Sequence, residues 1–235
     1  ASWAYALYLS SSSSNRIANN NITANGLRFG VSVYLLANSD NNNITDNLIK
    51  CTGEAHMSYH YSIYLSSSDS NRILNNTIQQ TSGPQAAIYL SSSTQNIFSG
   101  NNITTTQSEA FDIVGSDISS YNNTIDTSNL ADGKPILYLF NNDSIVIENY
   151  NDDYGLIYVA FSNNLTIRNI TMVERDGIRL KYTNNSIIED INLTNTTANG
   201  IVIYSSNNNT VRDSFISIKS TVGSMPKSIY VISSV

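Results

Sequence analysis

The chain has 235 residues, of which 40% are hydrophobic and 13% are charged, and its formal net charge is −6. A weakly acidic chain is unsuited to binding nucleic-acid phosphates, and no apolar run reaches the length of about 18 residues that a membrane-spanning helix needs. The single cysteine, Cys51, cannot form a disulfide within the chain.

A repeated unit organises the sequence and is clearest at residues 61–79, YSIYLSSSDSNRILNNTIQ. Each repeat opens with two apolar residues separated by one position, which is the period of a β-strand. The first members of these pairs are Leu7, Val33, Ile63, Ile88, Phe111, Leu137, Ile157, Ile178, Ile201 and Ile229. The second members are Leu9, Leu35, Leu65, Leu90, Ile113, Leu139, Val159, Leu180, Ile203 and Val231.

Two more columns follow in each repeat at nearly constant spacing, about ten and then five residues further on, whereas the return to the next repeat varies from 5 to 14 residues. The third column runs Ile17, Ile44, Ile73, Phe98, Ser120, Ile147, Ile167, Ile188 and Val211, and the fourth runs Ile22, Ile49, Ile78, Ile103, Ile125, Asp152, Met172, Leu193 and Ile216. Short strands that cannot bury a face alone must stack. The spacing therefore predicts a parallel β-helix with two fixed sides and one corner that accepts insertions.

Three positions after the third column, the first half of the chain carries Asn20, Asn47, Asn76, Asn101 and Asn123. We expect these amides to form a buried ladder from turn to turn. Tyr150, Ile170 and Ile191 follow at this position and predict apolar stacking instead. Because Asp152 occupies an apolar column, we expect residues 149–154 to leave the register.

The pattern I-Y-L-x-x-S-x-x-N-x-I-x-x-N-x-I resembles the parallel β-helix repeats of the NosD-like and CASH (carbohydrate-binding and sugar hydrolase) families, which are abundant in surface proteins of methanogenic archaea. The resemblance covers nearly the whole chain. It implies an all-β, right-handed, single-stranded parallel β-helix of about ten coils with three short parallel sheets, in an exported protein. We expect one domain over residues 1–235, as a piece of a longer chain, because the sequence starts and stops within repeats.

The residue between the two apolar positions of the first strand must face outward. Seven tyrosines occupy this position: Tyr8, Tyr34, Tyr64, Tyr89, Tyr138, Tyr158 and Tyr230. They predict a row of tyrosines along the outside of the sheet. This row either binds a protein or a sugar, or only packs one turn against the next, as tyrosine does in strands. Glu148, Arg168, Glu189 and Arg212 alternate in charge one position after the third column, which favours a stabilising ladder.

Twelve N-x-S/T sequons occur in the chain, and six supply our candidates for glycosylation: Asn21, Asn75, Asn102, Asn164, Asn169 and Asn192. The longest early insertion holds Cys51, Glu54, His56 and His60. Because two histidines four positions apart converge only on a helix, we predict neither a metal site nor a cofactor here. The acidic residues Asp112, Asp152, Asp153, Glu174, Asp176, Glu189 and Asp190 do not form an evident catalytic pair, and we assign no catalytic residue.

These features favour a non-enzymatic, extracellular structural protein that associates with itself in a surface layer, sheath or filament. A carbohydrate-binding or carbohydrate-cleaving domain, which would be a polysaccharide lyase or glycoside hydrolase, is the alternative and makes cell-surface glycans a second possible partner. A NosD-like role in copper-site assembly, dependent on His56 and His60, is the third hypothesis.

Overall fold

The computed structural model describes residues 3–53, 59–81, 83–106, 108–196, 198–219 and 225–233. The described residues fall into two compact units, one within residues 1–133 and the other within residues 134–235. Both units are stacks of parallel strands, and together they make about nine turns of a β-helix. The prediction of one domain over residues 1–235 stays a prediction.

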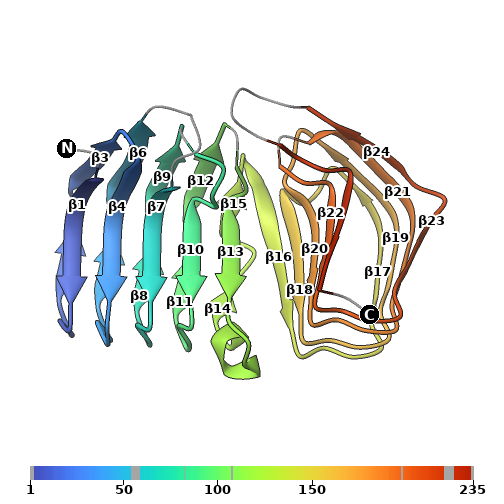
Figure 1. Ribbon diagram of the computed structural model, residues 1–235, viewed down its shortest axis with the longest axis horizontal. Helices are drawn as coiled ribbons and strands as arrows, with labels where there is room; N and C mark the ends of the chain where they lie inside the picture. The colour runs from blue at the N-terminus through green and yellow to red at the C-terminus, as the bar shows by residue number, and fades with distance from the viewer. Residues whose placement is uncertain are drawn as a thin grey trace. The chain divides into compact units, whose positions relative to one another are not determined.

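In the first unit each turn passes through three parallel sheets (Figure 1). The first sheet contains β1 (Trp3–Ser10), β4 (Phe29–Leu36), β7 (Tyr59–Ser66), β10 (Ile88–Ser91) and β13 (Phe111–Val114). The second contains β2 (Arg16–Ala18), β5 (Asn43–Thr45), β8 (Arg72–Leu74), β11 (Ile97–Ser99) and β14 (Thr124–Ile125). The third contains β3 (Asn21–Gly26), β6 (Leu48–Gly53), β9 (Thr77–Gln80), β12 (Asn102–Thr105) and β15 (Leu130–Ala131).

The apolar columns form the core of this unit, as the spacing predicts. Leu9, Leu35, Leu65, Leu90 and Ile113 are direct partners on successive strands. The last four are fully buried. Burying each such side chain contributes about 1.5–3 kcal/mol.

The fifth turn differs from the prediction because a short 3-10 helix, η1 (Ile118–Tyr121), is inserted ahead of β14. The insertion moves the register by five residues in the second sheet, where Ile125 pairs with Phe98, and by six in the third, where Ala131 pairs with Ile103. The assignments of Ser120 to the third column and Ile125 to the fourth column were therefore wrong.

In the second unit the second and third sides of each turn share continuous strands, so this unit has two sheets rather than three. The β16 sheet contains β16 (Lys134–Phe140), β18 (Leu156–Ala160), β20 (Gly177–Lys181), β22 (Ile201–Tyr204) and β25 (Ile229–Ile232). The β17 sheet contains β17 (Val146–Asn151), β19 (Thr166–Val173) and β21 (Ile187–Thr196), with β23 (Thr210–Arg212) and β24 (Phe215–Ile218) both paired to β21. Figure 1 shows the strands of the two sheets on opposite sides of each turn.

The core of the second unit follows the same columns, with Val159, Leu180 and Ile203 in register and buried. Strand β17 remains paired with β19 through Asn151, so the expected departure from register is wrong for Tyr150 and Asn151. Asp152 then takes a positive φ of 57°, and its carboxylate accepts a hydrogen bond from Arg175 at 3.1 Å.

The corners explain why asparagine, serine and aspartate are so frequent. In each unit, one position that recurs from turn to turn has a positive φ. In the first unit φ is 57–62° at Ser14, Asn41, Ser70 and Gln95, and in the second unit φ is 51–65° at Asn149, Asn169, Asp190 and Asp213. This left-handed conformation is tolerated best by glycine and by short polar side chains that hydrogen-bond locally. Within the described residues, no helix has the length and apolar character needed to cross a membrane.

Candidate functional site

Buried asparagines link successive turns of the first unit through a repeated hydrogen-bond arrangement. The side-chain oxygen of each asparagine accepts bonds from both the backbone N–H and the side-chain amide of the asparagine one turn earlier. Asn20, Asn47, Asn76, Asn101 and Asn129 form this ladder, with distances of 2.8–3.3 Å. The prediction was right for its first four members and wrong for the fifth, because the insertion of η1 moves Asn123 to another position.

Asn123 ends a second ladder that the sequence analysis missed. Its members are Asn15, Asn42, Asn71, Asn96 and Asn123, joined by bonds of 2.8–3.1 Å. Their constant position two residues before the third column was the available signal. The two ladders satisfy buried polar groups and tie each turn to the next, so their chemistry is structural.

The second unit replaces these ladders with apolar and ionic contacts. Tyr150, Ile170 and Ile191 are register partners, which confirms the predicted apolar stacking. On the outside, Arg168 Nε lies 2.6 Å from Glu148 Oε2, and Arg212 Nε lies 2.8 Å from Glu189 Oε2. The hydrogen bond and charge of Glu148 raise the pKa of Arg168, and Glu189 has the same effect on the pKa of Arg212. These exposed pairs support the strands.

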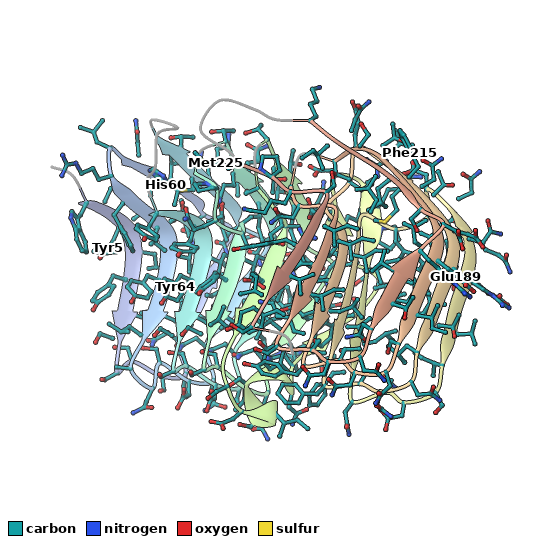
Figure 2. All side chains as sticks on the ribbon, turned by 45° about the vertical axis from the view of Figure 1, so that its right-hand side comes forward. Tyr5, His60, Tyr64, Glu189, Phe215 and Met225 are labelled. Atoms are coloured by element: carbon teal, nitrogen blue, oxygen red, sulfur yellow. The ribbon has the colours of Figure 1, made fainter. Side chains whose placement is uncertain are left out.

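The most distinctive surface of the first unit is a continuous cluster of rings on the outer side of the first sheet, here called the aromatic face. Its members are Trp3, Tyr5, Tyr8, Phe29, Tyr34, Tyr59, Tyr61, Tyr64 and Tyr89. Figure 2 labels two of them, Tyr5 and Tyr64. The predicted row accounts for Tyr8, Tyr34, Tyr64 and Tyr89, which are direct partners from strand to strand.

Sequence reasoning missed the other five members because they precede the apolar pair that defines each repeat. The register places Trp3, Phe29 and Tyr59 side by side, and Tyr5 and Tyr61 on either side of Val31. A second aromatic position upstream of the apolar pair was the signal for them. Trp3, Tyr59 and Tyr8 are 61%, 57% and 48% exposed, so the aromatic face is open to solvent.

Ring geometry limits what the aromatic face can contact. Tyr34 and Tyr64 are stacked, with centroids 4.8 Å apart and planes 14° apart, and Trp3 and Phe29 are stacked at 4.9 Å and 21°. Stacked rings cover each other's faces and leave their edges to solvent. The ring of Tyr89 is turned 78° from that of Tyr64. Burial, followed by the charges of neighbouring tyrosines, raises the pKa of Tyr34 to about 12 and also raises the pKa of Tyr61.

The tyrosines of the row in the second unit do not form an exposed surface. Tyr138 contacts Tyr158 at 5.6 Å, and Tyr158 is only 1% exposed. The expectation that Tyr158 faces solvent was wrong: it lies between its register partners Tyr138 and Arg179, and Lys181 Nζ lies 5.8 Å from its ring centroid. Tyr230 is half-buried under Lys227, whose Nζ lies 4.2 Å from the ring centroid.

The residues of the early insertion do not bring metal ligands together in the described structure. Glu54 and His56 lie outside the described residues. Cys51 and His60 are fully buried; the Cys51 thiol donates to Gly30 O at 3.4 Å, and His60 Nε2 lies 2.8 Å from Gly26 O. Across the part of the chain that is described, no three of the histidines, cysteines and carboxylates are grouped closely enough to hold a metal ion.

Three of the acidic residues singled out in the sequence, Asp152, Asp153 and Asp112, are engaged in structural contacts. Asp152 is bound by Arg175 and also lies 3.6 Å from Lys134 Nζ. Asp153 accepts a hydrogen bond from the backbone of Asn151 at 2.9 Å. In the first unit, Asp112 accepts a bond from the backbone N–H of Ile113 at 2.9 Å. These contacts favour roles in turns and strand support.

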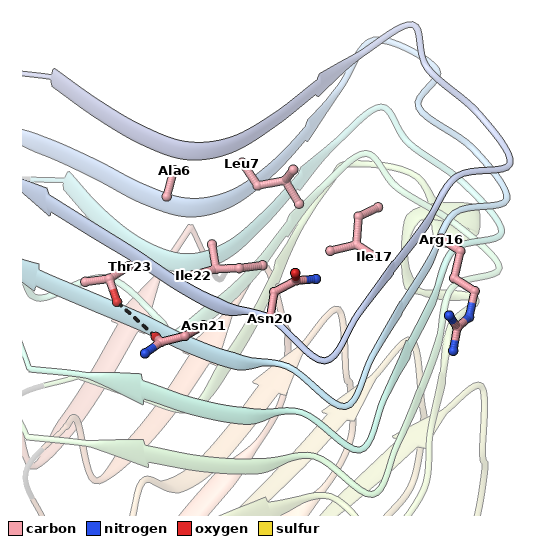
Figure 3. A pocket seen from close by; sticks show the side chains of 8 residues that line it. All are labelled: Ala6, Leu7, Arg16, Ile17, Asn20, Asn21, Ile22 and Thr23. Carbon is pink, nitrogen blue, oxygen red and sulfur yellow. Dashed lines mark hydrogen bonds between the residues drawn. The ribbon is translucent and has the colours of Figure 1, made fainter.

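One hollow of about 660 Å³ lies against the first turn of the first unit (Figure 3). It is lined by Ala6, Leu7, Arg16, Ile17, Asn20, Asn21, Ile22 and Thr23. Thr23 Oγ1 donates to Asn21 Oδ1 across 3.4 Å. These eight residues include neither a carboxylate nor an imidazole, so the hollow offers no acid–base pair.

All six glycosylation candidates are exposed. Asn21, Asn102 and Asn192 lie on strands β3, β12 and β21, whereas Asn75, Asn164 and Asn169 have positive φ values of 55°, 57° and 51°. The first three therefore face solvent from regular strands, and the other three occupy positions where the backbone itself favours asparagine.

Comparison with known proteins agrees with this architecture. The chain matches the family described as "Right handed beta helix region" over residues 2–129 and again over residues 61–233. No curated protein matches it significantly. Since the two matches cover almost the entire chain, the protein belongs to the right-handed β-helix family.

Proposed function

We propose that this chain is a non-enzymatic, extracellular structural protein that associates with other copies to build a surface layer, sheath or filament. The right-handed β-helix fold is compatible with structural and with carbohydrate-related roles. The resemblance of the repeats to those of archaeal surface proteins supports the extracellular location.

The two asparagine ladders of the first unit carry the proposal. Asn47, Asn76 and Asn101 are at most 2% exposed, and so are Asn42, Asn71 and Asn96 of the second ladder. Each of these side chains is committed to neighbouring turns, as described above. A molecule that devotes its buried polar groups to joining turns is suited to resist deformation along the stack.

The ion pairs made by the carboxylates also favour a structural role. Hydrolysis of a glycosidic bond by two carboxyl groups requires a pair separated by about 5–9.5 Å on either side of the substrate. Asp152 and Glu189 are instead bound by Arg175 and Arg212. These ion pairs hold the two carboxylates against neighbouring strands and turns, which favours a supporting role over a catalytic one.

The experiment is to measure association directly. Purified chain is examined by sedimentation velocity over a series of rising concentrations, and the same samples are imaged by negative-stain electron microscopy. Ordered oligomers, sheets or filaments that grow with concentration are expected. A single monodisperse monomer at the highest concentration would contradict the proposal.

A carbohydrate-binding role is the second candidate, and the aromatic face is the observation that favours it. Exposed rings that are tilted from their neighbours, such as Tyr8 and Tyr59, suit the apolar faces of sugars. Trp3 is the only tryptophan, so its fluorescence reports on a ligand at this face. Saturable fluorescence changes with a polysaccharide, abolished by Tyr8→Ala and unaffected by Tyr230→Ala in the second unit, would support binding; no change with any polysaccharide tested would remove this candidate.

A further inference from the structure

The structure separates the six candidate sequons into two groups with different reasons for carrying asparagine. One group lies on regular strands and faces solvent: Asn21, Asn102 and Asn192. The other, here called the corner group, has a left-handed backbone: Asn75 and Asn164 lie between strands, and Asn169 lies where the register is interrupted within β19. The question for each site is whether the fold itself needs the side chain.

The strand group shares one local geometry. Each site reads Asn, then an apolar residue, then Thr, and the apolar residue points into the core: Ile103 and Leu193 are fully buried. Asparagine and threonine therefore project from the same outer side of the strand. Thr23 Oγ1 donates to Asn21 Oδ1 at 3.4 Å, and Thr194 Oγ1 donates to Asn192 Oδ1 at 3.3 Å.

The fold does not require asparagine at these three positions. The register partners of Asn21 and Asn102 on neighbouring strands are Leu48, Thr77 and Leu130, and those of Asn192 are Thr171 and Phe215. Side chains of quite different chemistry thus occupy the same column. Asparagine is also depleted in strands, so its presence needs another explanation.

The corner group does have a structural explanation. Asn164 Nδ2 donates to Ser144 Oγ one turn away at 3.1 Å, and Asn169 Nδ2 donates to Asn149 Oδ1 at 2.7 Å. The side chain of Asn75 lies over Gly100, where a Cβ would collide with it. A positive φ accounts for asparagine at all three corners without any modification.

We propose that Asn21, Asn102 and Asn192 are acceptors of N-linked glycans, and that Asn75, Asn164 and Asn169 are retained for the fold. The co-reactant is a lipid-phosphate-linked oligosaccharide. The amide nitrogen attacks the anomeric carbon, the bond from that carbon to the phosphate oxygen breaks, and the lipid phosphate leaves while the amide loses one proton. The inference relies on the extracellular location proposed above.

The placement of these sites fits the rest of the surface. Asn21 and Asn102 lie on the third sheet of the first unit, whereas the aromatic face lies on its first sheet. The two sites are three turns apart, which is about 14 Å at the usual strand spacing. Glycans there cover one side of the unit and leave the aromatic face open for contact.

The first test imposes secretion, so it does not depend on where the natural protein resides. The chain is secreted from a glycosylating yeast, the folded fraction is isolated, and glycopeptides are measured by mass spectrometry. Glycans are expected at Asn21, Asn102 and Asn192, each lost in the matched variant Thr23→Val, Thr104→Val or Thr194→Val. Absence of glycans from these three sites, or equal occupancy at Asn75, Asn164 and Asn169, overturns the proposal.

The second test uses unmodified chain from a bacterial host and asks whether the side chains matter for folding. Asn102→Gln is expected to leave the urea midpoint unchanged, whereas Asn169→Ala lowers it because the bond to Asn149 is lost. Equal losses for the two variants would overturn the distinction between the groups. Self-association is measured on the same unmodified chain, so failure of the proposed function and failure of the glycan proposal are separate results.

Discussion

Replacement of Asn76 by alanine tests whether the asparagine ladders stabilise the first unit. Asn76 Oδ1 accepts bonds from the backbone N–H and the side-chain amide of Asn47 at 3.0 and 3.1 Å. Its own amide donates to Ile44 O at 2.9 Å and to Asn101 Oδ1 at 3.0 Å. The side chain is 1% exposed, so water cannot replace these partners.

The magnitude follows from the groups that lose a partner. Asn76→Ala leaves the buried backbone N–H of Asn47 without its acceptor, which costs about 1–3 kcal/mol. Loss of the two bonds donated by Asn76 adds about 0.5–1.5 kcal/mol each. We therefore expect the free energy of unfolding to fall by about 2–6 kcal/mol, a large fraction of the total stability of a domain.

Urea unfolding monitored by the fluorescence of Trp3 reports on this unit. Asn20→Ala is the matched control, because Asn20 belongs to the same ladder but is exposed and donates only to Ala18 O and Asn47 Oδ1. It is expected to cost less than about 1 kcal/mol. Equal losses for Asn20→Ala and Asn76→Ala, or a loss below about 1 kcal/mol for Asn76→Ala, would refute the reasoning.

Three further predictions concern other parts of the molecule. Glu189→Gln removes the partner of Arg212, so it should lower the urea midpoint at low ionic strength and have no effect at high salt; a salt-independent loss would point to packing instead. Because the pKa of Tyr34 is raised to about 12 in the folded state, the unfolded chain loses this proton first, and stability should fall between about pH 10 and 12. Tyr34→Phe should make that fall smaller, as measured by urea unfolding across this pH range, and an unchanged fall would show that Tyr34 is not responsible. Gly53→Ala places a Cβ against Gly26 O and His60 Nε2, so it should destabilise the first unit by about 1–3 kcal/mol in urea unfolding, and a neutral result would contradict the packing described here.

The repeat architecture could be predicted from sequence because it depends on a period. Buried positions such as Leu35, Leu65 and Leu90 must be apolar in every turn. Because the buried positions within each turn have a nearly constant spacing, the sequence shows a periodic pattern of apolar residues. The same reasoning failed at η1, where the chain adds residues within a side that was rigid in the preceding turns. Ser120, Asn123 and Ile125 were then counted from the wrong starting point.

The candidate surface was predicted only in part, and the reasons are physical. Strand alternation placed Tyr8 and Tyr64 on the outside, but the aromatic face extends to Trp3, Phe29 and Tyr59, which lie upstream of the aligned positions. The alternation of side chains along a strand predicts the face from which a side chain projects, but it does not predict which neighbouring side chains cover it. Tyr158 leaves the strand outward but is buried among Tyr138, Arg179 and Lys181, and the repeat period does not predict these contacts.

The corners show a different limit. Asparagine is suited to a left-handed backbone position, to a buried hydrogen-bond ladder and to a glycosylation sequon, and the sequence alone does not distinguish these three roles. Only the backbone angle and the side-chain partners separate Asn169, which serves a corner, from Asn102, which faces solvent on a strand.

The central claim is that successive turns of the first unit are joined in register by their asparagine side chains. Scalar coupling through a hydrogen bond measures this directly, by NMR on isotope-labelled protein. The account predicts couplings from the backbone nitrogen of Asn47 to the side-chain carbonyl carbon of Asn76, and from that of Asn76 to Asn101. The claim would be contradicted if couplings between the backbones of neighbouring strands were detected, but neither the backbone nitrogen of Asn47 nor that of Asn76 showed a coupling to the next asparagine side chain.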